Sequence, residues 1–419
     1  MSTIKPFRAV RYNSEKVQDI SKVVSPPYDV INADEQAELE KKSPYNFVRI
    51  DLAKETAEDD KDHNKYTRAK DLYEEWLKKG ILKQDDKPGI YFYKQEYKIQ
   101  GQKYSRTGFI SLMTLENEEE SKVVPHENTH AHAVEDRLKL LKSLHSSLSC
   151  IFVCYSDRGK KVEKIFNRIQ SNPPLANVKD KDDVQHTIWQ LTDPDAIKEI
   201  NDTLEDQHIF IADGHHRFKV AMEYRQQQMA LHKQTTGEEP YNYVLTYFTN
   251  IDSKDLKIFP MHRIVKEFPQ DLSPLEEFFR IDKIRKEDLV ILLAQAGKNE
   301  NAFGLYMRGG VWLMRLKNKR LINDHVKEGS LDYKSLDATI LKTFVFDRLG
   351  ISSHDIIYTK DLNDVTSMVN EQKADAGFVL NPVKISQLKA IALNGERMPP
   401  KTTYFYPKVL SGLTVYKMD

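Results

Sequence analysis

The sequence predicts an α+β protein, and three observations carry this prediction. Segments with the hydrophobic period of helices alternate along the chain with short strand-like runs. No internal repeat or low-complexity tract stands out. Of the 419 residues, 40% are hydrophobic, with 20 Tyr and 18 Phe, a composition typical of a folded globular protein. A chain of this length is long enough for two or three domains.

Several elements are predicted in the first part of the chain. Residues 23–30, VVSPPYDV, form a rigid extended loop because their two prolines forbid a helix. Asn64–Leu77 is predicted as an amphipathic helix. The runs Ile90–Ile99 and Tyr104–Leu112 alternate in polarity around a glycine, which indicates a β-hairpin. Asp136–Leu148 repeats leucines at helical spacing and is predicted as a second helix.

A buried strand is predicted next, in the segment CIFVCY that holds Cys150 and Cys154. Four residues along a strand span roughly 13 Å, which is too far for a disulfide bond. Both cysteines are therefore expected to be small core residues. Free cysteines fit a reducing, cytoplasmic compartment.

The hydrophobic pattern restarts after about Phe268, and we place a domain boundary near residue 265. Residues 1–265 are expected to form a first domain. Residues 266–419 are expected to form a C-terminal α/β or α+β region whose tail packs back on the first domain. Tyr243–Thr249 is predicted as a buried strand before this boundary. The elements predicted after it are a helix near Lys286–Ala296, strands at Ala302–Met307 and Val311–Leu316, a helix near Leu336–Leu349, and a strand at Asp375–Leu380 followed by a helix that ends at Gly395.

Charge and hydropathy exclude two classes of partner. Lys+Arg and Asp+Glu both number 63, so the chain has no overall basic field to attract nucleic acid. It contains no run of 18 apolar residues, so no membrane span is expected. The first residues, MSTIKPFRAV, lack the apolar core of a secretory signal.

The segment IFIADGHHR, residues 209–217, is the strongest candidate for a binding site. Four apolar residues lead into Asp213 and Gly214, and a stretch with helical periodicity follows. A strand that ends at a glycine before a helix directs several backbone N–H groups toward one point, where anions bind. His215, His216 and Arg217 add donors suited to phosphate or carboxylate. The alternative is an ordinary strand-to-helix turn with surface histidines.

The window PHENTHAHAVEDR, residues 125–137, is dense in ionisable groups that could ligate a metal, move protons or hold phosphate. These groups are His126, Glu127, His130, His132, Glu135, Asp136 and Arg137. Their spacing matches no standard zinc pattern. The alternative is a solvated loop that caps a helix beginning near Asp136.

Other candidates are more scattered. Asp29, in SPPYDV, is either a catalytic carboxylate or a turn residue. The pair His262 and Arg263 follows a probable strand and on its own indicates a surface position. The tail 394–413 combines Arg397, Lys401 and Lys408 with several aromatic residues, so it is expected to fold back onto the body. There its cations would complete an anion site or cover a sheet edge.

Taken together, these segments resemble the DUF1015 family of unknown function. The segments that carry the resemblance are KPFRAVRYN, SPPYDVI, SPYNFVRIDL, PHENTH, EDRLKLL, IADGHHRFKVA, PMHR and GERMPPKTTYFYPKVLSGL. DUF1015 looks like an elaborated member of the ParB/sulfiredoxin-like superfamily, which includes ADP-dependent kinases acting on free serine. The resemblance therefore implies a ParB/sulfiredoxin-like core with a long insertion.

The resemblance also implies roles for particular residues. Phosphate and nucleotide binding falls on Asp213, Gly214, His215, His216 and Arg217, and the earlier superfamily motif falls on Pro26 to Asp29. The kinases use a glutamate near that first motif, whereas this chain has Asp29, with Glu127 as the alternative acid. The candidates for substrate binding are Tyr28, His126, Arg137, His262, Arg263, Arg397 and Lys401. The catalytic candidates are Asp29, Glu127, His215 and His216.

These expectations combine into a phosphotransferase that acts on a small hydroxylated metabolite. Serine and O-phosphoserine are the leading pair, and ADP or ATP, with Mg²⁺ as its companion, is the expected nucleotide. A phosphorylated small molecule is the expected partner, and neither nucleic acid nor membrane is. One alternative is a phosphoserine phosphatase, in which water replaces the nucleotide. The other is a nucleotide-dependent binding module without metabolic catalysis. No metal ligand set is assigned.

Overall fold

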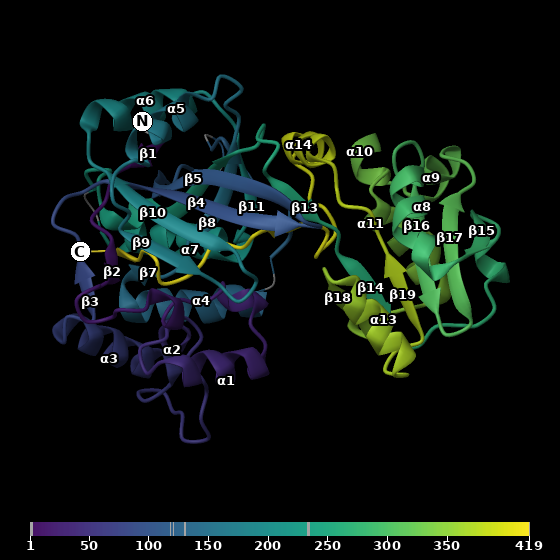
Figure 1. The fold of residues 1–419 in the computed structure, drawn as a ribbon, viewed down its shortest axis with the longest axis horizontal. Helices are drawn as coiled ribbons and strands as arrows, with labels where there is room; N and C mark the ends of the chain where they lie inside the picture. Colours follow the sequence, from purple (N-terminus) through teal and green to yellow (C-terminus); the bar gives the residue numbers. More distant parts are fainter. Residues whose placement is uncertain (1–2, 118, 120, 130, 233–234, 419) are drawn as a thin grey trace. The chain divides into compact units, whose positions relative to one another are not determined.

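The computed structural model describes residues 3–117, 119, 121–129, 131–232 and 235–418. The chain divides into two compact units (Figure 1). The first comprises Met1–Val124, Thr129–Leu256 and Pro407–Asp419, and the second comprises Pro125–Asn128 and Lys257–Tyr406. The sequence analysis placed its boundary near residue 265. His130 of the ionisable window lies outside the described residues.

The first unit is built on a mixed sheet. Within the described residues this sheet has nine strands, in the order β6-β11-β8-β12-β5-β4-β10-β9, with β1 paired to β5. β12 runs parallel to β8, and β11 runs parallel to β6, whereas the other pairings are antiparallel. The strands of this sheet are β1 (Ile4–Lys5), β4 (Ile90–Ile99), β5 (Gln102–Thr114), β6 (Val123–Val124), β8 (Ile151–Tyr155), β9 (Ala176–Lys179), β10 (Gln185–Leu191), β11 (Ile209–Asp213) and β12 (Tyr243–Asn250).

Helices cover both faces of this sheet. In Figure 1, α5 and α6 lie on one side of the strands and α4 lies on the other. Apolar residues of α5 and α6 pack with the sheet in one core, and α3 and α4 form a second core with the N-terminal segment. The helices of this unit are α1 (Ala33–Lys42), α2 (Val48–Asp51), α3 (Lys65–Lys78), α4 (Ala131–Leu144), α5 (Lys161–Ile169), α6 (Pro194–Leu204) and α7 (His215–Leu231). The short strands β2 (Val10–Tyr12) and β3 (Leu82–Gln84) pair with each other, and β7 (Ser146–Ser147) pairs with β21 (Tyr416–Lys417).

The second unit contains an antiparallel sheet in the order β15-β17-β16-β19-β14-β18. All of its described pairings are antiparallel, so the expected α/β arrangement is wrong for this region and the α+β alternative describes it. The β16–β17 connection is a hairpin, whereas the β15–β16 and β18–β19 connections each contain a helix, Leu289–Ala296 and Leu362–Asn370, and the segment 317–355 joins β17 to β18. The strands of this unit are β14 (His262–Val265), β15 (Phe279–Ile284), β16 (Ala302–Met307), β17 (Gly310–Leu316), β18 (Ile356–Thr359) and β19 (Ala376–Val379), and β13 (Lys257–Phe259) pairs with β20 (Tyr404–Tyr406).

Helices pack on both faces of the second sheet, because two separate apolar clusters lie against it. These helices are α8 (Leu289–Ala296), α9 (Arg320–His325), α10 (Leu331–Lys334), α11 (Asp337–Leu341), α12 (Asp347–Leu349), α13 (Leu362–Asn370) and α14 (Ile385–Leu393). A turn of π-helix, Lys342–Phe346, joins α11 to α12, so the predicted helix 336–349 is confirmed with a change of winding inside it.

Most predicted elements are present, with shifted ends. The predicted hairpin is β4 and β5, and the helix predicted at Asn64–Leu77 is α3, which Asn64 caps. The prediction for Asp136–Leu148 is displaced, because α4 spans Ala131–Leu144. Cys150 and Cys154 are buried free thiols, as expected. No helix of the described residues is long and apolar enough to cross a membrane.

Candidate functional site

The turn between β11 and α7 has the geometry that its sequence predicts. β11 is buried, and its pairing with β8 shifts register between Ile211 and Asp213. Gly214 then takes a φ of +88° at the N-terminus of α7, a conformation that side chains with a Cβ rarely adopt. The first helical hydrogen bond runs from Phe218 N–H to the Gly214 carbonyl at 3.0 Å. The N–H groups of residues 215–217 precede that bond and point out of the helix end.

The Arg217 side chain folds back onto this turn. Its Nη2 donates to Asp213 Oδ2 at 2.9 Å, and its Nη1 donates to the carbonyl of Cys150. A Cβ added at Gly214 would lie 3.0 Å from the guanidinium carbon of Arg217. The glycine therefore leaves the space in which Arg217 packs, in addition to permitting the backbone turn. His215 is buried and His216 is half-buried beside it.

Asp213 lies between two cations. Lys408 Nζ is 2.7 Å from Asp213 Oδ1, while Arg217 holds the other carboxylate oxygen. Burial opposes ionisation of Asp213, but the attraction of Lys408 and Arg217 outweighs it, so the pKa of Asp213 lies below its ordinary value. With Asp213 ionised, these three side chains carry a net positive charge at the N-terminus of α7.

The backbone around Lys408 is held by buried polar side chains of the main sheet. Gln95 Nε2 donates to the Lys408 carbonyl at 2.8 Å, and Arg106, which is fully buried, donates to the carbonyl of Pro407. Further along, Ser25 and Ser411 pair through an isolated β-bridge. The backbone of Lys408 is therefore held in position by side chains of the main sheet.

The segment Pro26–Asp29 interacts with Arg217 and with a further cation, Arg137. The guanidinium of Arg137 lies over the Tyr28 ring, 4.2 Å from its centre. Tyr28, Asp29 and Asp51 all interact electrostatically with Arg217. Tyr28 is half-buried, and desolvation, followed by the charge of Asp29, raises its pKa. Asp29 itself is exposed.

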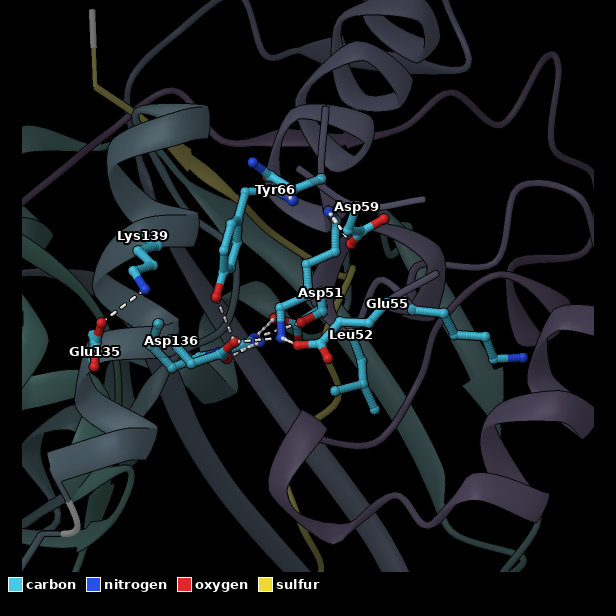
Figure 2. Close-up of polar contacts among 12 residues, drawn as sticks. Asp51, Leu52, Glu55, Asp59, Tyr66, Glu135, Asp136 and Lys139 are labelled. Atoms are coloured by element: carbon cyan, nitrogen blue, oxygen red, sulfur yellow. Dashed lines mark hydrogen bonds and ion pairs between the residues drawn. The ribbon is translucent and has the colours of Figure 1, made fainter. Parts of the chain in front are cut away.

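Arg137 links this region to a network of acids. Its Nη2 donates to Asp136 Oδ2 at 2.7 Å, and its Nη1 donates to the backbone carbonyl of Asp51. Asp136 also accepts from the Tyr66 hydroxyl at 2.9 Å and lies 2.7 Å from Lys65 Nζ. Figure 2 shows Tyr66 reaching down to Asp136, with Asp51 on the opposite side of the network.

The pKa values of Asp136 and Asp51 in this network are shifted in opposite directions. Burial raises the pKa of Asp136, but Arg137, Lys65 and Tyr66 outweigh it and bring the pKa to about 2. Burial also dominates at Asp51, and there it raises the pKa because Arg137 offsets it only in part. Asp136 is therefore a structural anion, whereas Asp51 is a buried carboxyl that resists ionisation.

The ionisable window 125–137 is divided between the units. Arg137 belongs to the first unit, whereas His126 and Glu127 belong to the second. There, the His126 carbonyl accepts from Met398 N–H at 2.7 Å, and Glu127 Oε1 accepts from Lys401 N–H at 3.3 Å. Arg397 donates to the carbonyl of Pro125. Arg397 and Lys401 thus meet the His126–Glu127 segment within the second unit.

The pair His262 and Arg263 is buried, so the prediction of a surface position is wrong. Each side chain is only 4% exposed, because β14 pairs on both of its edges. Burial, followed by the neighbouring charge of Arg263, lowers the pKa of His262 to about 4. Its Nδ1 accepts from Leu380 N–H at 3.2 Å, as a neutral imidazole does.

Two residues of the site escaped the sequence analysis. Lys408 was noted as a tail cation, but nothing local distinguishes it from Lys401. Asp51 is the second-to-last residue of the segment SPYNFVRIDL, which carries part of the family resemblance, and its burial has no signal in the local sequence. No group of three or more His, Cys, Asp or Glu side chains suited to a metal ion occurs in the described part of the chain.

Three solved structures are distantly similar to this chain. A free serine kinase mutant in complex with AMP is 12% identical, with 68% of this chain and 84% of that chain covered and a TM-score of 0.36. SbnI with a C-terminal truncation, from Staphylococcus aureus, is 11% identical, with coverage of 72% and 85% and a TM-score of 0.36. A conserved hypothetical protein from Pyrococcus furiosus is 13% identical, with coverage of 70% and 92% and a TM-score of 0.35.

No curated protein matches the chain. The family model described as "protein of unknown function (DUF1015)" matches residues 4–339, which is most of the chain. This match confirms the resemblance that the sequence segments carried. The chain belongs to the DUF1015 family.

Proposed function

We propose that the first unit binds a phosphorylated small molecule at the β11–α7 turn and transfers a phosphoryl group to or from a small hydroxylated metabolite. The observation that carries the proposal is the turn itself. A glycine at φ +88° opens a 17-residue helix, and Arg217 and Lys408 fix positive charge beside that helix end. Helix dipole, N–H groups and fixed cations all favour a phosphate at this point.

The residues divide into direct contacts and support. The N–H groups of residues 215–217 and the His216 side chain are the proposed contacts to phosphate. Arg217 already donates to Asp213 and Cys150, so its proposed role is to fix the turn and supply charge from behind it. Fixed positive charge of this kind stabilises the transition state of phosphoryl transfer without reorganising during the reaction.

Asp29 is the proposed general base. It is exposed, and it interacts electrostatically with Arg217. In the forward direction, the metabolite's hydroxyl oxygen would bond to phosphorus as the bond from phosphorus to the leaving oxygen breaks, and Asp29 would take the hydroxyl proton. Glu127, the alternative acid, belongs to the second unit and holds Lys401 N–H there. Asp51 is too deeply buried to reach a substrate hydroxyl directly.

ADP or ATP is the proposed nucleotide, and serine with O-phosphoserine is the first pair to test. The sequence resemblance supports this choice, because it assigns the 213–217 turn to the nucleotide-phosphate motif of a ParB/sulfiredoxin-like core and Pro26–Asp29 to an earlier motif of that superfamily. The interaction of Asp29 with Arg217, from segments far apart in the sequence, is consistent with such a core. Mg²⁺ would accompany the nucleotide mainly through its phosphates, with Asp29 as the exposed acid at hand.

The test is a phosphate-transfer assay on the full chain. Serine is incubated with ADP or ATP, and O-phosphoserine is incubated with and without AMP or ADP, and products are followed by ³¹P NMR. His216→Ala should weaken nucleotide binding about tenfold, the scale of one hydrogen bond to phosphate, about 1.5 kcal/mol. Asp29→Asn should lower kcat by about 100-fold or more with little change in nucleotide affinity.

His63→Ala is the matched control, because that histidine side chain is 86% exposed and lies in a surface loop. If O-phosphoserine released inorganic phosphate without nucleotide, the activity proposed for this site would be hydrolysis and not phosphoryl transfer. Nucleotide affinity that is equal in the folded His216→Ala, Gly214→Ala and His63→Ala proteins would remove the turn from the proposal.

A further inference from the structure

A second pocket lies within the second unit and is lined by charges of both signs. It is formed by β14, by the α8–β16 connection, by the start of α11 and by the β19–α14 connection. Its empty space is about 520 Å³, a value that includes solvent at the open mouth. The charged side chains that line it are Arg263, Lys384, Glu300 and Asp337. All belong to the second unit, so the inference stands independently of the proposed phosphoryl transfer.

Arg263 is a buried cation that interacts electrostatically with Asp337 without forming a direct ion pair with it. Its guanidinium donates to the carbonyl of Met261 and, at 3.3 Å, to that of Lys401, and it lies 5.4 Å from the centre of the Tyr358 ring. Across the described residues, it forms no ion pair with a carboxylate. Carbonyl dipoles satisfy some of its N–H groups and Asp337 offsets part of its charge, but a buried charge without a direct ion pair remains costly. A carboxylate in the pocket would remove that cost.

Asp337 provides the opposite charge in the same pocket. It is the first residue of α11, and its Oδ1 accepts from Asn301 Nδ2 at 2.8 Å. Asn301 also donates to the Ser335 carbonyl, so the amide holds the carboxyl group in one orientation. Burial raises the pKa of Asp337 to about 6, although Lys384 and Arg263 act in the opposite direction. A bound cation beside Asp337 would stabilise its ionised form.

The mixture of positive and negative side chains in the pocket indicates the class of ligand that it can bind. A simple dianion such as phosphate would gain from Arg263 and Lys384 but would be repelled by Asp337 and Glu300. A simple cation would be attracted by Asp337 and Glu300 but repelled by Arg263 and Lys384. A zwitterion satisfies both signs at once, and the rest of the lining combines apolar side chains with the amides of Asn381 and Gln387. We propose that this pocket binds a small free α-amino acid, with its carboxylate on Arg263 and its ammonium group on Asp337.

The first test uses the full chain and matched ligands. L-Alanine and L-serine are titrated by calorimetry at pH 7.5, beside propionate, which lacks the ammonium group, and alaninamide, which lacks the carboxylate. The amino acids should bind at least tenfold more tightly than either analogue. Equal affinity for propionate would reduce the pocket to a carboxylate site, and no binding of either amino acid at millimolar concentration would overturn the proposal.

Variants then locate the binding. Asp337→Asn keeps the size of the side chain and should weaken amino-acid binding at least tenfold, whereas Asp324→Asn, at an exposed position on α9, should leave it unchanged. Arg263→Gln serves as the second variant if its melting temperature shows that it folds. His216→Ala should bind the amino acids normally. Loss of binding in His216→Ala together with normal binding in Asp337→Asn would assign the amino acid to the β11–α7 turn and refute the pocket.

Discussion

Replacing Lys408 by Met should destabilise the first unit, because it leaves Asp213 with one cation in place of two. The two ion pairs of Asp213 measure 2.7 Å to Lys408 and 2.9 Å to Arg217, and the side chains are 12%, 18% and 10% exposed for Lys408, Asp213 and Arg217. Unit charges about 4 Å apart attract by about 4 kcal/mol at an effective dielectric constant of about 20. Desolvation of the ammonium group offsets part of this, and Arg217 remains, so we expect a loss of about 2 kcal/mol.

A double-mutant cycle isolates the pair. Lys408→Met, Asp213→Asn and the double variant are unfolded in urea, and the coupling free energy should be about 1.5–3 kcal/mol. A Trp312→Phe background restricts tryptophan fluorescence to Trp76 and Trp189, which are both in the first unit. The measurement then reports the unfolding of that unit alone.

The control cycle uses Lys70 and Glu74 on α3. Their charged atoms are 3.8 Å apart, and their side chains are 46% and 62% exposed, so their coupling should stay below about 0.5 kcal/mol. A Lys408–Asp213 coupling no larger than this surface pair would refute the reasoning. It would mean that the segment holding Lys408 stabilises the β11–α7 turn by packing and not by the ion pair with Asp213.

Three further predictions concern single positions. Gly214→Ala should cost about 1–2 kcal/mol, the cost of a left-handed conformation with a Cβ, whereas Gly159→Ala, with ordinary contacts and no positive φ, should cost less in the same urea titration. Because the folded-state pKa of His262 is lowered to about 4, its unfolded form binds more protons between pH 6.5 and 4, so stability should fall by about 2 kcal/mol from pH 7 to pH 5. A His262→Gln protein should lose that pH dependence, and an unchanged pH profile would contradict the assignment. Tyr66→Phe removes the hydroxyl that donates to Asp136 and should lower the free energy of unfolding by about 1 kcal/mol. An unchanged free energy of unfolding would mean that water replaces the hydroxyl as hydrogen-bond donor to Asp136.

Local patterns predicted those parts of the molecule that depend on neighbouring residues. The β4–β5 hairpin and the β11–α7 turn are examples, since alternation and a single glycine determine them. α4 shows the limit of this reasoning. The sequence predicts a helix start at Asp136 because aspartate commonly caps helices. It lies inside α4, where Lys65 and Arg137 hold it, and the helix ends before His145, whose φ of +46° carries no glycine signal.

The site shows the same division. The residues of the 213–217 turn are adjacent in sequence, and their local pattern is what makes them candidates. Lys408 reaches Asp213 only because Gln95 and Arg106 fix the backbone at 407–408 from the main sheet, and such long-range contacts leave no local pattern. The family resemblance pointed to Tyr28 and Asp29, but their interaction with Arg217 depends on the folded sheet.

The return of residues 407–419 to the first unit has a consequence for biosynthesis. Domains generally fold as they leave the ribosome, with N-terminal ones first. Here the first unit lacks Lys408 and the strand β21 until the whole of the second unit has been made. The second unit can therefore reach its native state before residues 407–419, which belong to the first unit, have been synthesised. A nascent chain stalled before residue 407 would carry Asp213 and Arg217 without Lys408, so the charge of the turn is completed only after the second unit has been synthesised.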